Sequence, residues 1–368
     1  MKVAYYIGSL NRGGAEMLLL DICRKKECAP YELLLVYRNE GELSGCFRST
    51  GVPMFRLKPK GLKLSYFNQL RRLLKHENVE ILHAQTLTNA VIGVFVTLFT
   101  KIRLVATFHG FYQSRLNALY RHVVMWNADA MVFVSKDLRE WYTEHSLLCP
   151  RHRCHVVYNG INFDKLDTEY PVPDFLTMTN DDKRKTVRLA MVGNFTGVRS
   201  QIVVCRGFKL LKKEGINYID LYFVGKKVEA EPQYYDECIK YCMDNEINDM
   251  VHFVGSRGDV PAILQHIDGF VYSSIRDSFG IAVVEALASG APVIVNDWKV
   301  MVEIIQNKEW ASFFHSNDEK DCCEKIIQLV ENIELRKQQA QIHMVEVRNT
   351  YSIEKHIMNL NKVYEDIV

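Results

Sequence analysis

Short apolar runs alternate with amphipathic stretches along most of the chain, and this alternation limits the fold more than any other feature. Residues 3–9 (VAYYIGS), 79–85 (VEILHAQ) and 103–110 (RLVATFHG) each suit a buried strand, and the stretches between such runs suit helices. Strands that alternate with helices form βαβ units, which join parallel strands of one sheet. The sequence therefore predicts an α/β fold with mainly parallel sheets.

A polar break near the middle of the chain divides this alternation in two. Residues 164–185 hold two prolines and the charged run DDKRK, and a strand pattern restarts directly afterwards. A length of 368 residues favours two domains. We therefore predict two Rossmann-like, doubly wound domains over residues 1–165 and 186–350, joined by a linker at 166–185. Ligands bind such sheets beyond the carboxyl ends of the strands, and we expect the two domains to face a shared cleft.

The composition excludes several classes of protein. Lys and Arg number 46 against 44 Asp and Glu, a net charge of +2, whereas nucleic-acid-binding domains are usually strongly basic. The longest apolar run, residues 90–100, falls short of the roughly 20 residues of a transmembrane helix, so we expect a buried helix or strand there. The first residues lack the features of a signal peptide. We expect a cytoplasmic protein that binds no nucleic acid.

The ten cysteines form no framework of the kind found in small secreted domains. One cluster, residues 149–155 (CPRHRCH), places two cysteines and two histidines close together. Structural zinc sites usually spread paired ligands over two knuckles, so a loop that leads into a strand is the preferred interpretation. We predict no metal site.

The most informative motif is residues 271–297, which read as strand, loop, helix and strand. Gly280 at the helix start leaves backbone N–H groups open to a phosphate. Asp277 and Glu285 are eight residues apart, or roughly 12 Å along a helix, which suits a sugar at one end of a nucleotide diphosphate and a ribose at the other. The alternative is an N-capping acid followed by a solvated Glu, although the apolar neighbours of Glu285 disfavour a solvated face.

Three further stretches follow predicted strands. Arg199, a few residues beyond the strand end at Asn194, could hold an anionic phosphate or lie on the surface. Gly13 and Gly14 allow close approach of a ligand, or simply form a strand–helix turn. His109 could donate a hydrogen bond or act as an acid or base, and its alternative is a structural role.

Together these stretches resemble the retaining nucleotide-sugar glycosyltransferases of the family 4 type, which have the GT-B fold. The resemblance covers nearly the whole chain, in the family's order. It rests on six segments: GGAE (13–16), EILHAQ (80–85), TFHG (107–110), VYNGIN (157–162), VHFVGSRGDVPAIL (251–264) and the Asp277-to-Glu285 motif with the ALASGAPVI that follows it.

The resemblance implies a role for each matching residue. It implies catalytic roles for His109 at the transferred sugar, Asp277 at the sugar hydroxyls and Arg199 at the diphosphate. It also implies that the donor is bound by residues from several strand ends: Gly13, Gly14, Asn194, Arg199, Ser278, Phe279, Gly280, Val284 through its N–H group, and Glu285 at the ribose. The final helix, residues 351–368, is expected to return to the first domain.

Several positions depart from the family pattern. Asp277 stands where the family has Glu, Asn194 where it has Arg, Arg199 where it has Lys, and Gln85 where it has His. Arg in place of Lys keeps the charge but changes its geometry. These departures leave two alternatives open: a non-catalytic nucleotide-sugar or glycan-binding protein, and a nucleotide-sugar 2-epimerase of the same fold.

As the resemblance implies, we expect a retaining hexosyltransferase that moves a sugar from a UDP- or GDP-sugar to a glycan or lipid-linked acceptor in cell-surface polysaccharide synthesis. No D-x-D pair occurs, so a metal-bridged diphosphate has no obvious ligands and we expect no cofactor. A basic, partly apolar stretch at 56–63, followed by Arg71, Arg72 and Lys75, could contact the inner leaflet of the membrane. The alternative is a solvated loop and helix face.

Overall fold

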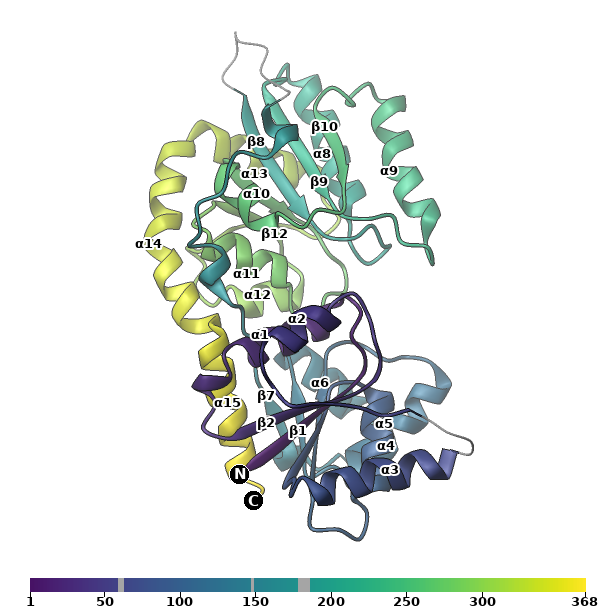
Figure 1. The fold of residues 1–368 in the computed structure, drawn as a ribbon. Coiled ribbons are helices and arrows are strands. Elements are labelled where there is room, and N and C mark those ends of the chain that lie inside the picture. The colour runs from purple at the N-terminus through teal and green to yellow at the C-terminus, as the bar shows by residue number, and fades with distance from the viewer. Residues whose placement is uncertain (59–62, 147–148, 178–185) are drawn as a thin grey trace. The chain divides into compact units, whose positions relative to one another are not determined.

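The chain forms two compact units, each built on its own parallel sheet. The computed structural model describes residues 1–58, 63–146, 149–177 and 186–368. Unit 1 comprises residues 1–162 and 351–368, and unit 2 comprises residues 163–350. The sheets have seven and six strands with helices beside them, so the predicted α/β fold with parallel sheets is confirmed (Figure 1).

The sheet of unit 1 has the strand order β3-β2-β1-β4-β5-β6-β7, and every neighbouring pair is parallel. Its strands are β1 (Lys2–Ser9), β2 (Glu32–Asn39), β3 (Met54–Arg56), β4 (Ile81–Ala84), β5 (Arg103–Phe108), β6 (Ala130–Phe133) and β7 (Cys154–Val156). Its helices are α1 (Gly14–Arg24), α2 (Ser44–Ser49), α3 (Lys63–His76), α4 (Leu87–Thr97), α5 (Arg115–Asn127), α6 (Lys136–Glu144) and α15 (Ile353–Glu365). The order of the strands reverses between β1 and β4, which marks the point where such sheets bind ligands.

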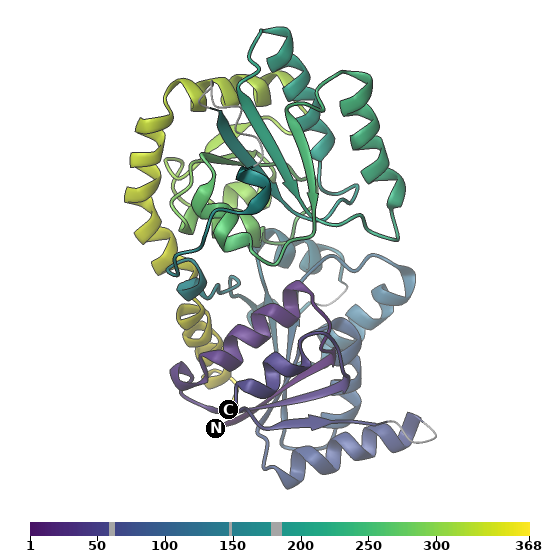
Figure 2. The same ribbon diagram turned by 45° about the horizontal axis from the view of Figure 1, so that its top comes forward.

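The sheet of unit 2 has the order β10-β9-β8-β11-β12-β13, again all parallel (Figure 2). Its strands are β8 (Val187–Val192), β9 (Ile219–Val224), β10 (Val251–Gly255), β11 (Gly269–Tyr272), β12 (Val293–Asn296) and β13 (Ser312–Phe314). Its helices are α7 (Asp174–Thr177), α8 (Gln201–Lys213), α9 (Pro232–Asp244), α10 (Val260–His266), α11 (Ile281–Ala288), α12 (Lys299–Ile304), α13 (Glu319–Glu331) and α14 (Ile333–Tyr351). Here the reversal lies between β8 and β11.

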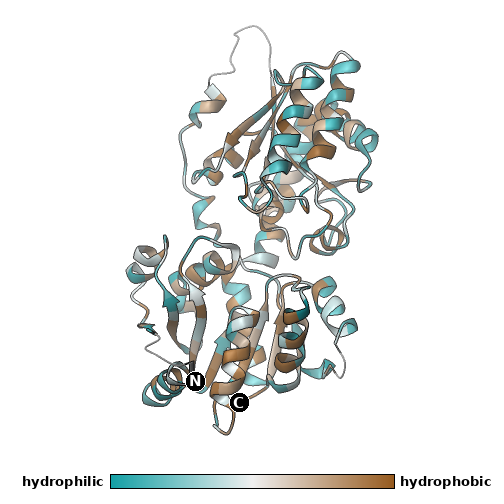
Figure 3. Cartoon of the chain, turned by 90° about the vertical axis from the view of Figure 1, so that its right-hand side faces the viewer, coloured by the Kyte–Doolittle hydropathy of each residue, from teal (hydrophilic) through white to brown (hydrophobic). Residues whose placement is uncertain are grey.

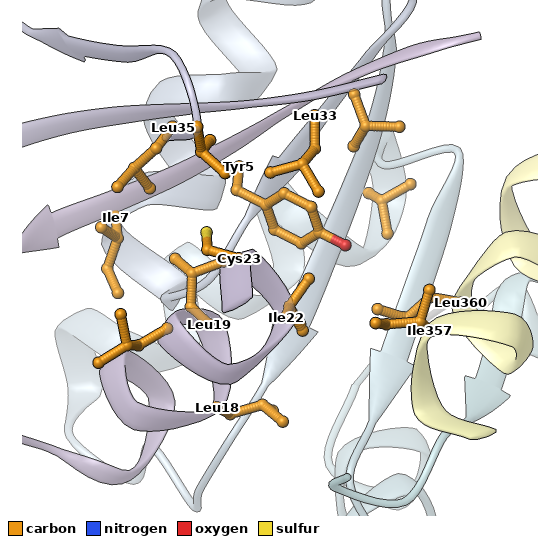
Figure 4. Packing of buried hydrophobic residues seen from close by; sticks show 14 of the residues in the cluster. Tyr5, Ile7, Leu18, Leu19, Ile22, Cys23, Leu33, Leu35, Ile357 and Leu360 are labelled. Carbon is orange, nitrogen blue, oxygen red and sulfur yellow. The ribbon is translucent and has the colours of Figure 1, made fainter. Parts of the chain in front are cut away.

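The core of unit 1 joins elements from both ends of the chain. Leu19 of α1 and Tyr5 of β1 are fully buried, and they share one apolar cluster with Ile357 and Leu360 of α15. Figure 4 shows side chains of α1 directed at the strands, with Ile357 and Leu360 nearby. Figure 3 shows that the helices mix hydrophobic and hydrophilic residues, as expected of elements with one buried face. Helix α15 is therefore part of the core of unit 1.

One expectation from the sequence needs adjustment, and part of another lies outside the described residues. The apolar run at 90–100 contributes to helix α4, where Val96 is fully buried, but two large side chains near its end are not: Phe95 is 51% and Phe99 is 96% exposed. Of the predicted linker, residues 178–185 lie outside the described part of the chain, and α7 occupies residues 174–177.

Candidate functional site

Two loops of unit 2 are joined at the carboxyl ends of β8 and β11, where the strand order reverses. Ser200 N–H donates to the Ser273 carbonyl at 3.2 Å. The Val198 carbonyl accepts from Ile275 N–H at 2.9 Å and from Ser274 Oγ at 3.0 Å. These bonds fix the β8–α8 loop, which carries Arg199, beside the β11–α11 loop, which carries Asp277.

Arg199 and Asp277 form an ion pair in this structure. Arg199 Nη1 lies 3.2 Å from Asp277 Oδ2, and the two side chains are 26% and 13% exposed. The same Oδ2 accepts a hydrogen bond from the hydroxyl of Tyr272, the last residue of β11. The Arg199 guanidinium carbon also lies 5.2 Å from the centroid of the Tyr272 ring, within range of a cation–π interaction. Two predicted site residues thus meet, and Tyr272, which was not predicted, contacts both.

Helix α11 begins directly after Gly280, as the sequence predicted. Gly280 is its N-cap, with φ of 91° in the left-handed region, and no side chain caps the helix. Asp277 therefore does not cap α11; its Oδ1 accepts from the adjacent Ser278 N–H at 3.2 Å. Because Asp277 precedes the helix, the helical rise applies to only part of the chain between Asp277 and Glu285.

The first amides of α11 give the site its hydrogen-bond donors. Val284 N–H donates to the Gly280 carbonyl at 3.3 Å, so it is already used within the helix, contrary to its expected exposure to a phosphate. In the described part of the chain, the N–H groups of Ile281 and Ala282 have no recorded partner. They are the open donors of the first turn, where an anion is favoured by the helix dipole.

The remaining predicted residues of unit 2 differ in exposure. Phe279 is 1% exposed, which leaves only its backbone for a ligand, whereas Ser278 is partly exposed. Glu285 is partly exposed between the buried residues Val284 and Ala286. Asn194 is exposed, and its Oδ1 accepts from Lys226 N–H at 3.3 Å, so it connects the β8 and β9 loops.

The glycine loop of unit 1 ends at the start of α1. Gly13 is the N-cap, and a Cβ placed there would lie only 2.4 Å from Glu16 Oε2. Gly13 therefore makes room for the Glu16 carboxylate, which folds back over the loop, while Gly14 is exposed. Burial raises the pKa of Glu16 above its ordinary value. Glu16 was not among the predicted site residues.

His109 follows β5 and lies against Gln85, which follows β4. His109 Nε2 is 3.2 Å from Gln85 Oε1, an acceptor, so Nε2 carries the hydrogen in this arrangement. Burial, and secondarily the neighbouring His356, lowers the pKa of His109 to about 4. The imidazole is therefore neutral near pH 7. Gln85, where the family pattern has His, holds the ring in one orientation.

The basic stretch of unit 1 is partly used inside the fold. Arg71 donates from Nε to the Val96 carbonyl at 2.9 Å and from Nη2 to the Phe95 and Leu98 carbonyls at 3.0 and 2.9 Å, so it caps the end of α4. Arg72 and Lys75 are exposed on α3. Residues 59–62 of the stretch lie outside the described residues. Within the described ranges, no helix combines the length and apolarity that crossing a bilayer requires.

Comparison with known proteins links each half of the chain to a family. Residues 12–165 match the model "Glycosyltransferase Family 4", and residues 179–343 match the model "Glycosyl transferases group 1". The O-antigen biosynthesis glycosyltransferase WclY of Escherichia coli is 20% identical over 319 residues, 83% of this chain and 82% of that protein.

Two further similarities extend over most of the chain. The UDP-Gal:alpha-D-GlcNAc-diphosphoundecaprenol alpha-1,3-galactosyltransferase of Escherichia coli is 20% identical over 307 residues, 81% of this chain and 78% of that protein. Among solved structures, Anabaena HepE in complex with UDP superposes with a TM-score of 0.85 at 15% identity, covering 100% of both chains.

Proposed function

Because the chain belongs to the glycosyltransferases of the family 4 type with the GT-B fold, we propose that it transfers a sugar from a nucleotide diphosphate sugar to a glycan or lipid-linked acceptor with retention of configuration. The donor is a UDP- or GDP-sugar, and the UDP complex of HepE favours UDP. The observation that carries this proposal is the meeting of Arg199, Asp277 and the open amides of α11 at the strand reversal of unit 2.

This arrangement suits the departure of a nucleoside diphosphate. Negative charge builds on the leaving diphosphate as the glycosidic bond breaks, and prepositioned donors stabilise that charge. Arg199 supplies the cation, and the N–H groups of Ile281 and Ala282 supply backbone donors. A bound diphosphate accepts hydrogen bonds from the Arg199 N–H groups that Asp277 does not use, while the carboxylate oxygens of Asp277 accept hydrogen bonds from the sugar hydroxyls. Arg199 provides the counter-charge in place of a metal ion.

The residues of unit 1 that follow strands β1 and β5 contact the transferred sugar in this proposal. His109 is neutral and acts as a hydrogen-bond partner to the sugar, not as a charged acid, because its pKa lies far below 7. Gly13 and Gly14 allow the loop to approach the donor phosphates and the reaction centre. The acceptor hydroxyl attacks from the face that the diphosphate leaves, which retains the anomeric configuration.

The proposed acceptor is a glycan or a lipid-linked substrate of cell-surface polysaccharide synthesis. The related galactosyltransferase acts, by its name, on a diphosphoundecaprenol-linked sugar. The exposed Lys58, Arg72 and Lys75 supply positive charge for a peripheral contact with anionic lipid on the cytoplasmic side of the membrane.

A screen of nucleoside diphosphates by thermal shift, followed by turnover of the matching sugar donors, tests the proposal. We expect UDP or GDP to raise the melting temperature, and donor consumption to require an acceptor and to persist in EDTA. NMR of the product should show the anomeric configuration of the donor. Tight binding without turnover on any acceptor would indicate a binding protein, and consumption without acceptor would indicate an epimerase.

A further inference from the structure

We propose that Tyr272 is a positioning residue of the candidate site in unit 2, an inference that rests on the proposed function. Its hydroxyl holds the Asp277 carboxylate and its ring supports the Arg199 guanidinium. Asp277 and Arg199 are thereby fixed as one unit that meets the leaving diphosphate.

The contacts of Tyr272 converge on one carboxylate oxygen. The Tyr272 hydroxyl donates to Asp277 Oδ2, and Arg199 Nη1 approaches the same oxygen at 3.2 Å. The guanidinium carbon lies 5.2 Å from the ring centroid. Tyr272 therefore contacts both members of the ion pair, and hydrogen bonds to a charged group are among the stronger ones in proteins.

The backbone and ring of Tyr272 are fixed in place. Tyr272 is fully buried, pairs with Val295 of β12, and stacks against Phe270 with ring centroids 6.2 Å apart. A side chain held in this way gives its hydroxyl one location. Such rigid support is what keeps the neighbouring functional groups in a productive geometry.

The tyrosine also compensates for the short acidic side chain. Asp277 stands where the family pattern has Glu, and the missing methylene corresponds to roughly 1.5 Å of reach. The Tyr272 hydroxyl donates to Oδ2 of the Asp277 carboxylate, and Ser278 N–H donates to its Oδ1 at 3.2 Å. Both oxygens of the shorter carboxylate are thus held, and the Arg199 N–H groups not used by Asp277 remain available to a phosphate.

A reciprocal substitution tests this pairing. We expect Tyr272→Phe to lower kcat/KM about tenfold, mostly through kcat, because the charge that Arg199 meets develops in the transition state. Asp277→Glu alone should also lose activity, since the longer carboxylate collides with the hydroxyl. The double variant should be more active than either single variant; additive losses would overturn the pairing.

Tyr222→Phe is the matched control. Tyr222 lies on β9, is 1% exposed, and its hydroxyl donates to Asp220 Oδ2 at 3.5 Å, so it repeats the tyrosine–aspartate contact away from Arg199. We expect its activity to stay within about twofold of the wild type, as for a neutral change distant from the site. A loss equal to that of Tyr272→Phe would show a general effect of buried tyrosine hydroxyls.

A second readout does not depend on catalysis. Phenylglyoxal modifies accessible guanidinium groups, and mass spectrometry follows the rate at Arg199. We expect this rate to rise severalfold in Tyr272→Phe and to stay unchanged in Tyr222→Phe. An unchanged rate in Tyr272→Phe would overturn the positioning role even if the wild type proved to transfer no sugar, whereas failure of the proposed function alone would leave the rate difference intact.

Discussion

Replacing Gly280, the N-cap of helix α11, by alanine gives a quantitative test of why glycine is needed at this position. Its φ of 91° lies in the left-handed region, and a Cβ there would lie 2.8 Å from Met301 Cε and 3.3 Å from Ile304 Cδ1. Gly215, after α8, is a matched control, because its φ of 77° is also positive but an added Cβ would meet nothing within 4 Å. Alanine at either position tests the backbone strain, and only alanine at Gly280 adds crowding.

The expected cost follows from three contributions. A left-handed conformation costs an L-residue about 1–2 kcal/mol. Crowding against the flexible end of Met301 adds about 1 kcal/mol, the low end of the overpacking range. The lower entropy of the unfolded chain returns about 0.4–1 kcal/mol to both variants. We therefore expect a loss of about 2 kcal/mol for Gly280→Ala and about 1 kcal/mol for Gly215→Ala.

Urea unfolding followed by circular dichroism measures both losses, and calorimetry with UDP measures the effect on the site. We expect Gly280→Ala to weaken UDP binding as well, because the added methyl displaces the N–H groups of Ile281 and Ala282. Gly215→Ala should leave UDP binding unchanged. Equal losses of stability in the two variants, together with unchanged UDP affinity, would refute the assignment of these amides to the donor.

Three further predictions follow from contacts described above. Arg199→Ala should weaken UDP binding at least tenfold in calorimetry, because it removes the cation and leaves the Asp277 carboxylate facing the diphosphate. Arg71→Ala should lower the free energy of unfolding by about 1–3 kcal/mol in urea titrations, since it uncaps the end of α4, whereas Arg72→Ala on the exposed face should cost less than about 0.5 kcal/mol. Burial lowers the pKa of both His109 and His356 to about 4, so the unfolded chain binds more protons than the folded chain between pH 4 and about 6.5; stability should fall as the pH drops through this window, and His356→Gln should make the fall shallower in urea titrations at stepped pH.

The sequence predicted the central strands of both sheets because parallel strands buried on both faces appear as continuous apolar runs. It did not reveal β3 and β13, which have three residues each and lie at sheet edges. A run of three residues carries no measurable period, so these strands depend on the neighbour that pairs with them. The start of α11 at Gly280 was predicted, but the resemblance assigned the donor amide to Val284, whose N–H group is used inside the helix; the open amides are those of Ile281 and Ala282.

The site was predictable where one motif holds its residues, and less so where two loops meet. Asp277, Gly280 and Glu285 belong to one stretch of sequence with a recognisable order. Tyr272 was missed because a tyrosine at the end of a buried strand has the pattern of a core residue. Its role depends on Arg199, which is 73 residues earlier in the chain and reaches it only because the β8 and β11 loops are joined.

The packing of α15 has a consequence for how the protein is made. Residues 353–365 complete the core of unit 1, yet the ribosome adds them only after all of unit 2 has been synthesised. Unit 2 is continuous in sequence, whereas the nascent unit 1 lacks the apolar side chains of Ile357 and Leu360 that complete its core cluster. During translation the first unit to be made is thus the last to be finished, and the interval is a time when chaperones have an exposed apolar surface to bind.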